Sequence, residues 1–253
     1  MATLSYDDNG KGGVPAFVFV HGWCCNRSFF APQYEHFGRD ARAVAVDLRG
    51  HGESAPAADG DYSIAALAGD VAALIEELDI APAVVVGHSL GGVVTTQLAA
   101  SRPDLVAAAV LVDVAPMVIA AELQPIFDGL MAQLKGSDGE AARAALVDGM
   151  FLPSDDADRR AEIARAMAST PHDVAVPAIA GIMTVGGGAL AAVTCPIVSI
   201  GSAAPTHEPA ALKAVNPSVV IGQTVGAGHF NQLEVPDQVN AMIEQFLRVS
   251  LPT

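Results

Sequence analysis

A serine at the centre of Gly87-His88-Ser89-Leu90-Gly91 has the type and spacing expected of a nucleophile. The β-branched run "AVVVG" leads into it, and the helix-like run "SLGGVVTTQLAA" begins with it. Glycines two residues before and after the serine allow neighbouring backbone to approach a tight strand-to-helix turn, which leaves the hydroxyl exposed. The pattern therefore predicts that Ser89 attacks a substrate. The alternative is an ordinary serine that caps the free N–H groups of a helix.

A candidate base lies in the glycine-rich stretch "VGAGHFNQLEVPDQV". His229 follows the last expected strand and precedes the terminal helix, so it is the best placed of the seven histidines to reach Ser89. His21 and His88 flank the other motifs, and we expect them to line a substrate pocket, although a structural role is the alternative for each.

The stretch "HGWCCN" follows the strand-like run "AFVFV" and could complete an oxyanion-binding site. A loop at this place supplies a backbone N–H that, together with the N–H after the nucleophile, stabilises a developing negative charge. We therefore assign this task to the N–H groups of Trp23 and Leu90. The alternative is that His21 belongs to a simple turn and Trp23 only fills the core. Cys24 is expected to line the pocket, unless it is a small buried hydrophobe.

The elements that must position these residues alternate between strands and helices, which indicates a mainly parallel sheet with helices on both faces. Strand-like runs occupy 16–20, 42–47, 83–87, 107–114, 196–201 and 218–225. No strand pattern occurs between Pro116 and Thr194. We therefore expect a core domain of 1–115 and 195–253 and a helical cap of 116–194.

Three local patterns give sharper expectations. Ser63 begins a segment with apolar residues at three- and four-residue steps, which predicts a capped amphipathic helix. Thr170 and Pro171 predict a helix start, which Pro177 should kink or end early. The glycine-rich stretch 185–193 is expected to be a flexible hinge where the insertion returns to the sheet.

The composition of the chain limits which partners, cellular location and metal sites can be expected. The 253 residues are 51% hydrophobic and carry a net charge of −15, with lysine and arginine scattered along the chain. This charge argues against a nucleic-acid partner or an anionic membrane surface, and it favours solubility. The N-terminus lacks a signal-peptide pattern and no apolar run reaches about 20 residues, so we expect a cytoplasmic protein without a membrane span. The three cysteines show neither disulfide nor zinc-ligand spacing, so we expect them to be reduced and no metal to be bound.

The ordered motifs "HGW", "DLRGHGES", "GHSLGG", "LVDV" and "GAGHF" resemble the α/β-hydrolase fold family over nearly the whole chain. The resemblance implies an eight-stranded, mostly parallel sheet flanked by helices, with a missing or irregular first strand, and a helical cap inserted after strand six. It also implies a serine hydrolase of the esterase or lactonase kind that needs no cofactor.

The acid that orients the histidine departs from the usual family position, which is the loop after strand seven. Gly201 to Thr206 contain no carboxylate. Some members place the acid at the end of strand six, where this chain has Asp113. We therefore assign the acid to Asp113, with Glu208 as the runner-up. The alternative is a structural aspartate that binds local N–H groups.

These residues predict acyl transfer from a small to medium hydrophobic ester or lactone to water. The apolar cap residues support this expectation: Met117, Ile126, Leu130, Met150, Phe151, Met167 and Met183. The "GSAAPT" loop with an acid after strand six is similar to zearalenone-type lactone hydrolases, and "GWC" is similar to cofactor-independent dioxygenases of the same fold. A cofactor-free oxygenase and a non-catalytic small-molecule receptor are therefore the alternatives. No nucleic acid or membrane is expected as a partner.

Overall fold

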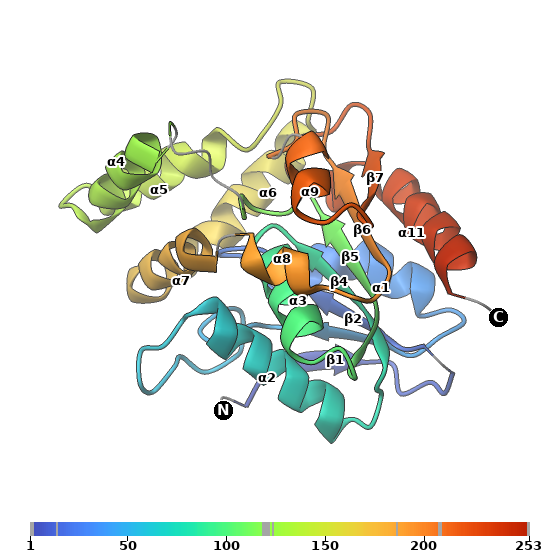
Figure 1. The fold of residues 1–253 in the computed structure, drawn as a ribbon. Helices are drawn as coiled ribbons and strands as arrows, with labels where there is room; N and C mark the ends of the chain where they lie inside the picture. Colours follow the sequence, from blue (N-terminus) through green and yellow to red (C-terminus); the bar gives the residue numbers. More distant parts are fainter. Residues whose placement is uncertain are drawn as a thin grey trace.

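The computed structural model describes residues 3–13, 15–117, 122, 124–185, 187–206 and 209–251. Its centre is a seven-stranded sheet in the order β1-β3-β2-β4-β5-β6-β7 (Figure 1). The strands are β1 (Tyr6–Asp8), β2 (Phe17–Val20), β3 (Ala43–Val46), β4 (Ala83–His88), β5 (Val106–Val112), β6 (Ile197–Gly201) and β7 (Val220–Gln223). β1 pairs antiparallel with β3, and every other pairing is parallel.

This sheet confirms the expected α/β class and the six strand-like runs of the sequence. The described residues form one strand fewer than the eight that the resemblance implies, as expected if the first strand is missing, so the helical insertion expected after strand six follows β5. β1 is an edge strand that the sequence did not indicate, because its side chains "YDD" are half-buried or exposed and mostly charged.

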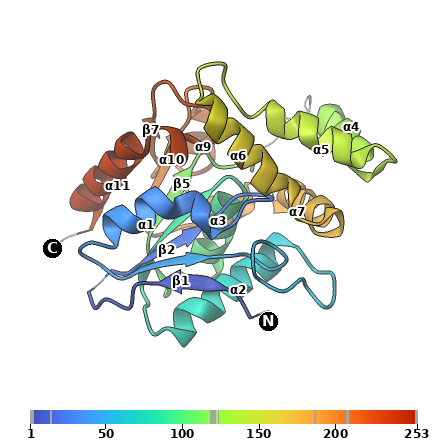
Figure 2. The ribbon, with the colours of Figure 1, turned by 180° about the vertical axis from the view of Figure 1, so that it is seen from behind.

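Helices connect and cover the strands. They are the 3₁₀-helix η1 (Arg27–Phe30) and the α-helices α1 (Ala31–Phe37), α2 (Ile64–Glu77), α3 (Leu90–Ser101), α4 (Gln124–Lys135), α5 (Gly139–Asp148), α6 (Ala157–Ala168), α7 (His172–Val185), α8 (Gly188–Ala192), α9 (Pro209–Val215), α10 (Asn231–Glu234) and α11 (Pro236–Ser250). Figure 1 shows α2, α3 and α8 on one face of the sheet, and Figure 2, seen from behind, shows α1 and α11 on the other.

Alternation along the strands produces two hydrophobic cores, one on each face of the sheet. Val18 and Val20 of β2 pack into the core under α2 and α3. Phe17 and Phe19 of the same strand pack into the opposite core with residues of α1 and α11, where Phe17 stacks on Phe37 with ring centroids 4.5 Å apart. Because both faces are covered, the central strands are buried throughout and the carboxyl edge of the sheet is fixed.

The start of α2 confirms the expected cap. The Ser63 hydroxyl accepts a hydrogen bond from Ala66 N at 3.3 Å, and the apolar face of the helix is buried. α7 begins at His172, close to the expected Thr170, but it continues past Pro177 to Val185, so the expectation of an early end was wrong. The expected hinge contains helix α8, whose Leu190 is buried in the core and is contacted through its carbonyl by Asn216 Nδ2 at 2.9 Å.

The described residues between β5 and β6 form α4 to α8 and contain no strand. α7 and α8 pack against α3. α5 contacts both α4 and α6, and α4 also contacts α7. In Figures 1 and 2 the helices α4 to α7 extend beyond one side of the sheet. They are therefore placed to cover the residues that follow the carboxyl ends of β4 and β5, which include Ser89 and Asp113.

Candidate active site

Ser89 sits on the tight turn between β4 and α3 in a backbone conformation that serines rarely adopt, with φ 51° and ψ −117°. Its side chain makes no capping hydrogen bond to α3, which rules out the ordinary helix-cap alternative. The flanking glycines are sterically required. A Cβ on Gly91 would lie 2.0 Å from Val20 O, and a Cβ on Gly87 would lie 2.1 Å from Gly91 O. The turn can therefore form only with glycine at both positions.

Asp113 and His229 are joined by a buried contact between elements 116 residues apart in the chain. His229 Nδ1 lies 2.6 Å from Asp113 Oδ2, and the Asp113 side chain is 1% exposed. The other carboxylate oxygen, Oδ1, accepts a hydrogen bond from Ser202 N at 2.9 Å. The carboxylate of Asp113 therefore does both things considered for it: one oxygen accepts a hydrogen bond from a nearby backbone N–H, and the other contacts His229. Glu208 lies outside the described residues.

The backbone of His229 is held from two sides. Its N–H donates to Met150 O at 3.1 Å, and its carbonyl accepts a hydrogen bond from His88 Nε2 at 2.9 Å. His88 is fully buried, and its ring centroid lies 4.7 Å from that of His229. Burial holds the pKa of His88 well below its usual range, with a smaller contribution from neighbouring His229. His88 therefore stays neutral with its proton on Nε2.

Asp155 is a residue of this site that the sequence analysis missed. It lies in the segment between α5 and α6, is 6% exposed, and accepts a hydrogen bond from Gly228 N at 2.9 Å and from Leu152 N at 2.7 Å. A Cβ on Gly228 would lie 2.5 Å from Asp155 Oδ2, so the two segments are in direct contact. The carboxylate thereby fixes the loop that carries His229. No sequence signal marks this role, because Asp155 is one of several acidic residues in a polar turn.

The two expected oxyanion donors lie beside Ser89. A Cβ on Gly22 would come within 3.2 Å of Ser89 Cβ, which places the turn before Trp23 against the nucleophile. Leu90 N belongs to the first turn of α3, where N–H groups have no partner within the helix. In the described part of the chain, neither the N–H of Trp23 nor that of Leu90 donates to a protein acceptor. The Trp23 indole Nε1 donates to Ala175 O at 2.7 Å, which anchors this turn to α7.

Ser89 and His229 open into an apolar cavity of about 290 Å³. The segment between β5 and β6, from its helices and from the turn between α5 and α6, supplies most of its wall: Phe127, Leu130, Met131, Leu146, Met150, Phe151, Leu152, Ile179 and Ile182. A smaller chamber next to it contacts Ser89, His229, His88, Cys25 and Met167. Of the other apolar residues expected to line a pocket, Met117 is buried in the core and Ile126 is exposed. The side chain of Met183 lies outside the described part.

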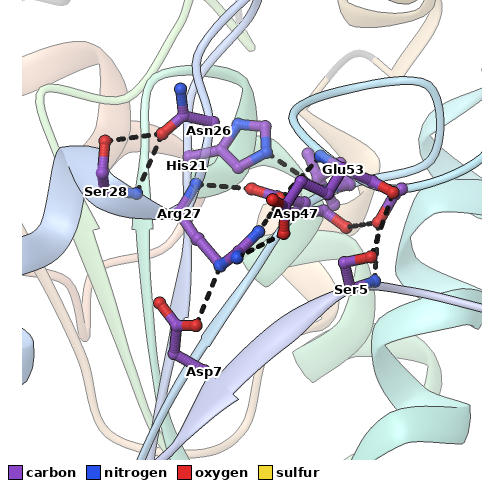
Figure 3. Close-up of polar contacts among 10 residues, drawn as sticks. Ser5, Asp7, His21, Asn26, Arg27, Ser28, Asp47 and Glu53 are labelled. Carbon is purple, nitrogen blue, oxygen red and sulfur yellow. Dashed lines mark hydrogen bonds and ion pairs between the residues drawn. The ribbon is translucent and has the colours of Figure 1, made fainter.

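Two of the expected pocket residues lie elsewhere. His21 is fully buried, and both its ring nitrogens bind backbone: Nδ1 donates to Gly22 O at 2.7 Å, and Nε2 accepts from Leu48 N at 3.0 Å. Figure 3 shows it close to the cluster in which Arg27 pairs with Asp7 and Asp47. His21 therefore has a structural role: from its place after β2 it holds the loop that follows β3.

Cys24 also lies away from the cavity. It is 1% exposed, and burial raises the pKa of its thiol to about 12. Its neighbour Cys25 contacts the small chamber instead. His88 is the member of the expected pocket set that does reach this chamber. All three cysteines are free.

A family model described as alpha/beta hydrolase fold matches residues 15–148, which include β2 to β5, Ser89 and Asp113. The chain belongs to this family. The resemblance stated from the motifs is thereby confirmed, and so is the fold class.

Lipase LipV of Mycobacterium tuberculosis is 38% identical over 163 residues, which make up 64% of this chain and 61% of that protein. A thermophilic esterase from Thermogutta terrifontis, solved with malate bound, has a TM-score of 0.84 at 24% identity, covering 98% of this chain and 94% of its own. The enol-lactonase from Burkholderia xenovorans LB400 has a TM-score of 0.82 at 24% identity, covering 96% of each chain. The chain spans 38% to 61% of the lengths of three curated relatives that are 37% or 38% identical to it.

Two further properties concern the described residues of this α/β-hydrolase-fold protein. None of their helices combines the length and the apolar character needed to cross a bilayer. They also contain no group of three or more histidine, cysteine, aspartate or glutamate side chains arranged to hold a metal ion.

The buried histidines make the stability of the fold depend on pH. Burial lowers the pKa of His21 to about 3, with a smaller contribution from His51, whose own pKa is also lowered by burial. Between the unfolded value of about 6.5 and this folded value, the unfolded chain binds more protons than the folded one. The free energy of unfolding should therefore fall as the pH falls below about 6.5, by up to about 1.4 kcal/mol per pH unit for His21 alone.

Urea unfolding at pH 7.5, 6.5, 5.5 and 5.0 measures this slope. The His21→Asn variant should be less stable at every pH and should show a shallower slope, because one of the proton-binding groups is gone. Constant stability of the wild type over this range would contradict the neutral state assigned to the buried histidines.

Proposed function

We propose that this protein is a serine hydrolase that cleaves an ester or lactone of a small to medium hydrophobic substrate through an acyl-enzyme intermediate. The observation that carries the proposal is the buried Asp113–His229 contact of 2.6 Å beside Ser89, in one apolar cavity at the carboxyl edge of the sheet. A carboxylate, an imidazole and a hydroxyl that lines the cavity are the groups that acyl transfer requires.

In the first half of the reaction, His229 Nε2 takes the proton of the Ser89 hydroxyl as its oxygen attacks the carbonyl carbon. The carbonyl oxygen becomes negatively charged and accepts hydrogen bonds from the N–H groups of Trp23 and Leu90. The protonated His229 then donates its proton to the departing alcohol oxygen, which leaves an ester on Ser89. Asp113 accepts a hydrogen bond from Nδ1–H, which keeps Nε2 free to act as the base.

In the second half, water enters the cavity and His229 removes one of its protons while the oxygen attacks the acyl carbon. The same two N–H groups bind the new oxyanion, and the Ser89 oxygen recovers its proton from His229 as the acid is released. A lactone follows the same steps, except that the alcohol remains attached to the acyl group and one open-chain hydroxy acid is the product.

The cavity walls favour an apolar substrate. Leucine, isoleucine, methionine and phenylalanine side chains line the space around Ser89, and burial of an apolar acyl or alcohol group against them is favourable. A cavity of about 290 Å³ fits a ligand of small to medium size. The names of the relatives, lipase, esterase and enol-lactonase, support the same bond class.

The direct test is hydrolysis of p-nitrophenyl acetate, butyrate and octanoate, followed by an unsubstituted aliphatic lactone monitored by acid release. We expect turnover of the esters without any added cofactor, with higher kcat/KM for butyrate than for acetate because the longer acyl group buries more apolar surface. Tight binding of these esters without release of p-nitrophenol would contradict the proposal and favour the receptor alternative.

Replacement of Asp155 should reduce turnover more than substrate binding. Asp155→Ala removes the acceptor for Gly228 N and Leu152 N and lets the loop that carries His229 move. Because a misplacement of about 1 Å can cost about 100-fold in rate, we expect kcat for p-nitrophenyl butyrate to fall by about 10- to 100-fold with KM nearly unchanged.

Asp158→Ala is the matched control, since it removes an exposed carboxylate from the next helix. It should leave kcat within about twofold of the wild type. Equal effects of the two substitutions, or an Asp155→Ala effect confined to KM, would show that the Asp155 carboxylate does not position the histidine.

A further inference from the structure

A second, larger hollow lies between α5 and α6, outside the cavity that contains Ser89. It has a volume of about 540 Å³. Most of its wall comes from residues spaced three or four apart on one face of each helix: Glu140, Arg143, Ala144, Val147 and Asp148 of α5, and Ala157, Arg160, Ala161, Ala164 and Ala168 of α6. Such spacing places side chains on a single helical face. The two faces together form a groove, here called the α5–α6 groove.

The charged residues of the α5–α6 groove are already paired with one another. Arg143 Nη2 contacts Glu140 Oε2 at 2.5 Å, and Arg160 Nη2 lies 3.4 Å from Asp148 Oδ1. Arg143 also donates to Thr170 O at 2.6 Å. The remaining wall is mostly alanine, which offers an apolar surface without bulky side chains. The groove therefore fits an uncharged aliphatic ligand better than an ionic one.

The groove and the candidate active site share walls. Phe151 lines both the α5–α6 groove and the 290 Å³ cavity. Met167 lines both the groove and the small chamber next to Ser89. A chain attached at Ser89 and longer than the cavity would therefore meet these two side chains and, beyond them, the groove.

Phe151 is held in place by contacts on two sides. Its ring centroid lies 5.3 Å from that of Phe230, the residue after His229, and the Arg160 guanidinium lies 5.2 Å from the Phe151 centroid. Phe151 is only half-buried, so its ring can rotate toward solvent at the cost of these contacts. A long aliphatic chain could offset that cost by burying its methylene groups on the alanine surface.

We propose that the α5–α6 groove binds the distal part of a long acyl chain whose carbonyl is at Ser89, and that Phe151 is the residue that limits passage of the chain. This inference rests on the proposed function, since the acyl group must be bound at Ser89, and it extends the substrate range from small and medium to long acyl chains. It assigns to the groove an uncharged alkyl ligand and to Phe151 control over the range of acyl-chain lengths that the enzyme accepts.

The test is the ratio of kcat/KM for p-nitrophenyl dodecanoate to that for p-nitrophenyl butyrate. Ala161→Phe fills the groove and should lower this ratio at least about 10-fold relative to the wild type, with butyrate hydrolysis unchanged. Phe151→Ala opens the shared wall and should raise the ratio about 10-fold. In the double variant the gain should disappear, because the opened passage then leads to a filled groove.

Ala145→Phe is the matched control, since Ala145 is exposed on α5 and does not line the groove. It should leave the ratio at the wild-type value. Ala164→Phe serves as a second groove-filling variant if Ala161→Phe fails to fold. The inference is overturned if both groove-filling variants keep the wild-type ratio, or if the gain from Phe151→Ala persists in the double variant.

Butyrate hydrolysis separates failure of this inference from failure of the proposed function. If the wild type and the groove-filling variants Ala161→Phe and Ala164→Phe hydrolyse butyrate at the same rate and the ratio does not respond to filling the groove, the proposed function stands and the groove is not an acyl-binding site. If the wild type hydrolyses neither ester, the proposed function fails, and the inference that rests on it fails too.

Discussion

Ser89→Ala should lower kcat for p-nitrophenyl butyrate by about 10⁶-fold, since loss of a serine nucleophile removes the covalent route and leaves only the oxyanion donors and binding. The substitution deletes one hydroxyl at a position that makes no capping hydrogen bond, so α3 loses no stabilising contact. KM should change little, because the cavity walls are untouched. The measurement is steady-state hydrolysis at concentrations of variant high enough to detect the residual rate.

Ser101→Ala is a suitable control for this experiment. Ser101 is the last residue of the same helix, is exposed, and donates to Gln97 O at 2.8 Å. We expect its kcat to stay within about twofold of the wild type. Retention of wild-type activity in Ser89→Ala would contradict the nucleophile assignment directly.

Asp113→Asn should lower kcat by about 10⁴-fold while leaving KM nearly unchanged. The reason lies in the two contacts of this side chain. Ser202 N donates to Oδ1, so an asparagine would keep its carbonyl oxygen there and turn its NH₂ group toward His229 Nδ1. The imidazole would then accept at Nδ1 and carry its proton on Nε2. In that tautomer His229 cannot take the proton from Ser89.

Asp40→Asn makes the same chemical change at an exposed position and should leave kcat unaffected. Both variants should unfold within a few degrees of the wild type, because asparagine retains the shape of aspartate. If Asp113→Asn hydrolyses butyrate at the wild-type rate, another carboxylate orients the histidine, and Glu208→Gln becomes the next variant to measure.

The sequence predicted the parts of the fold that depend on local pattern. Strand-like runs and helix spacing indicated the parallel sheet, and the glycines around Ser89 indicated a turn whose strained φ of 51° is found in the structure. Each of these features follows from residues that are neighbours in the chain. β1 escaped notice because a short, exposed edge strand has neither an apolar face nor a β-branched run to reveal it.

The parts of the site that the sequence did not predict depend on contacts between distant segments. Asp155 meets Gly228 across 73 positions of the chain, and nothing in the polar turn around it indicates which carboxylate is buried. His21 begins the conspicuous motif "HGW", yet its side chain turns into the core and binds the backbone of Leu48. Side-chain direction in a turn depends on the tertiary structure around it, and motif position alone does not determine it.

Covalent labelling of Ser89 tests the central claim most directly. The wild type is incubated with a small alkyl fluorophosphonate, its intact mass is measured, and the labelled residue is located by peptide mapping. We expect one adduct per chain, on Ser89, with hydrolysis of p-nitrophenyl butyrate lost in proportion to labelling, and slower labelling of Asp113→Asn. An adduct on another residue, or full hydrolytic activity in a fully labelled protein, would contradict the assignment of Ser89 as the nucleophile.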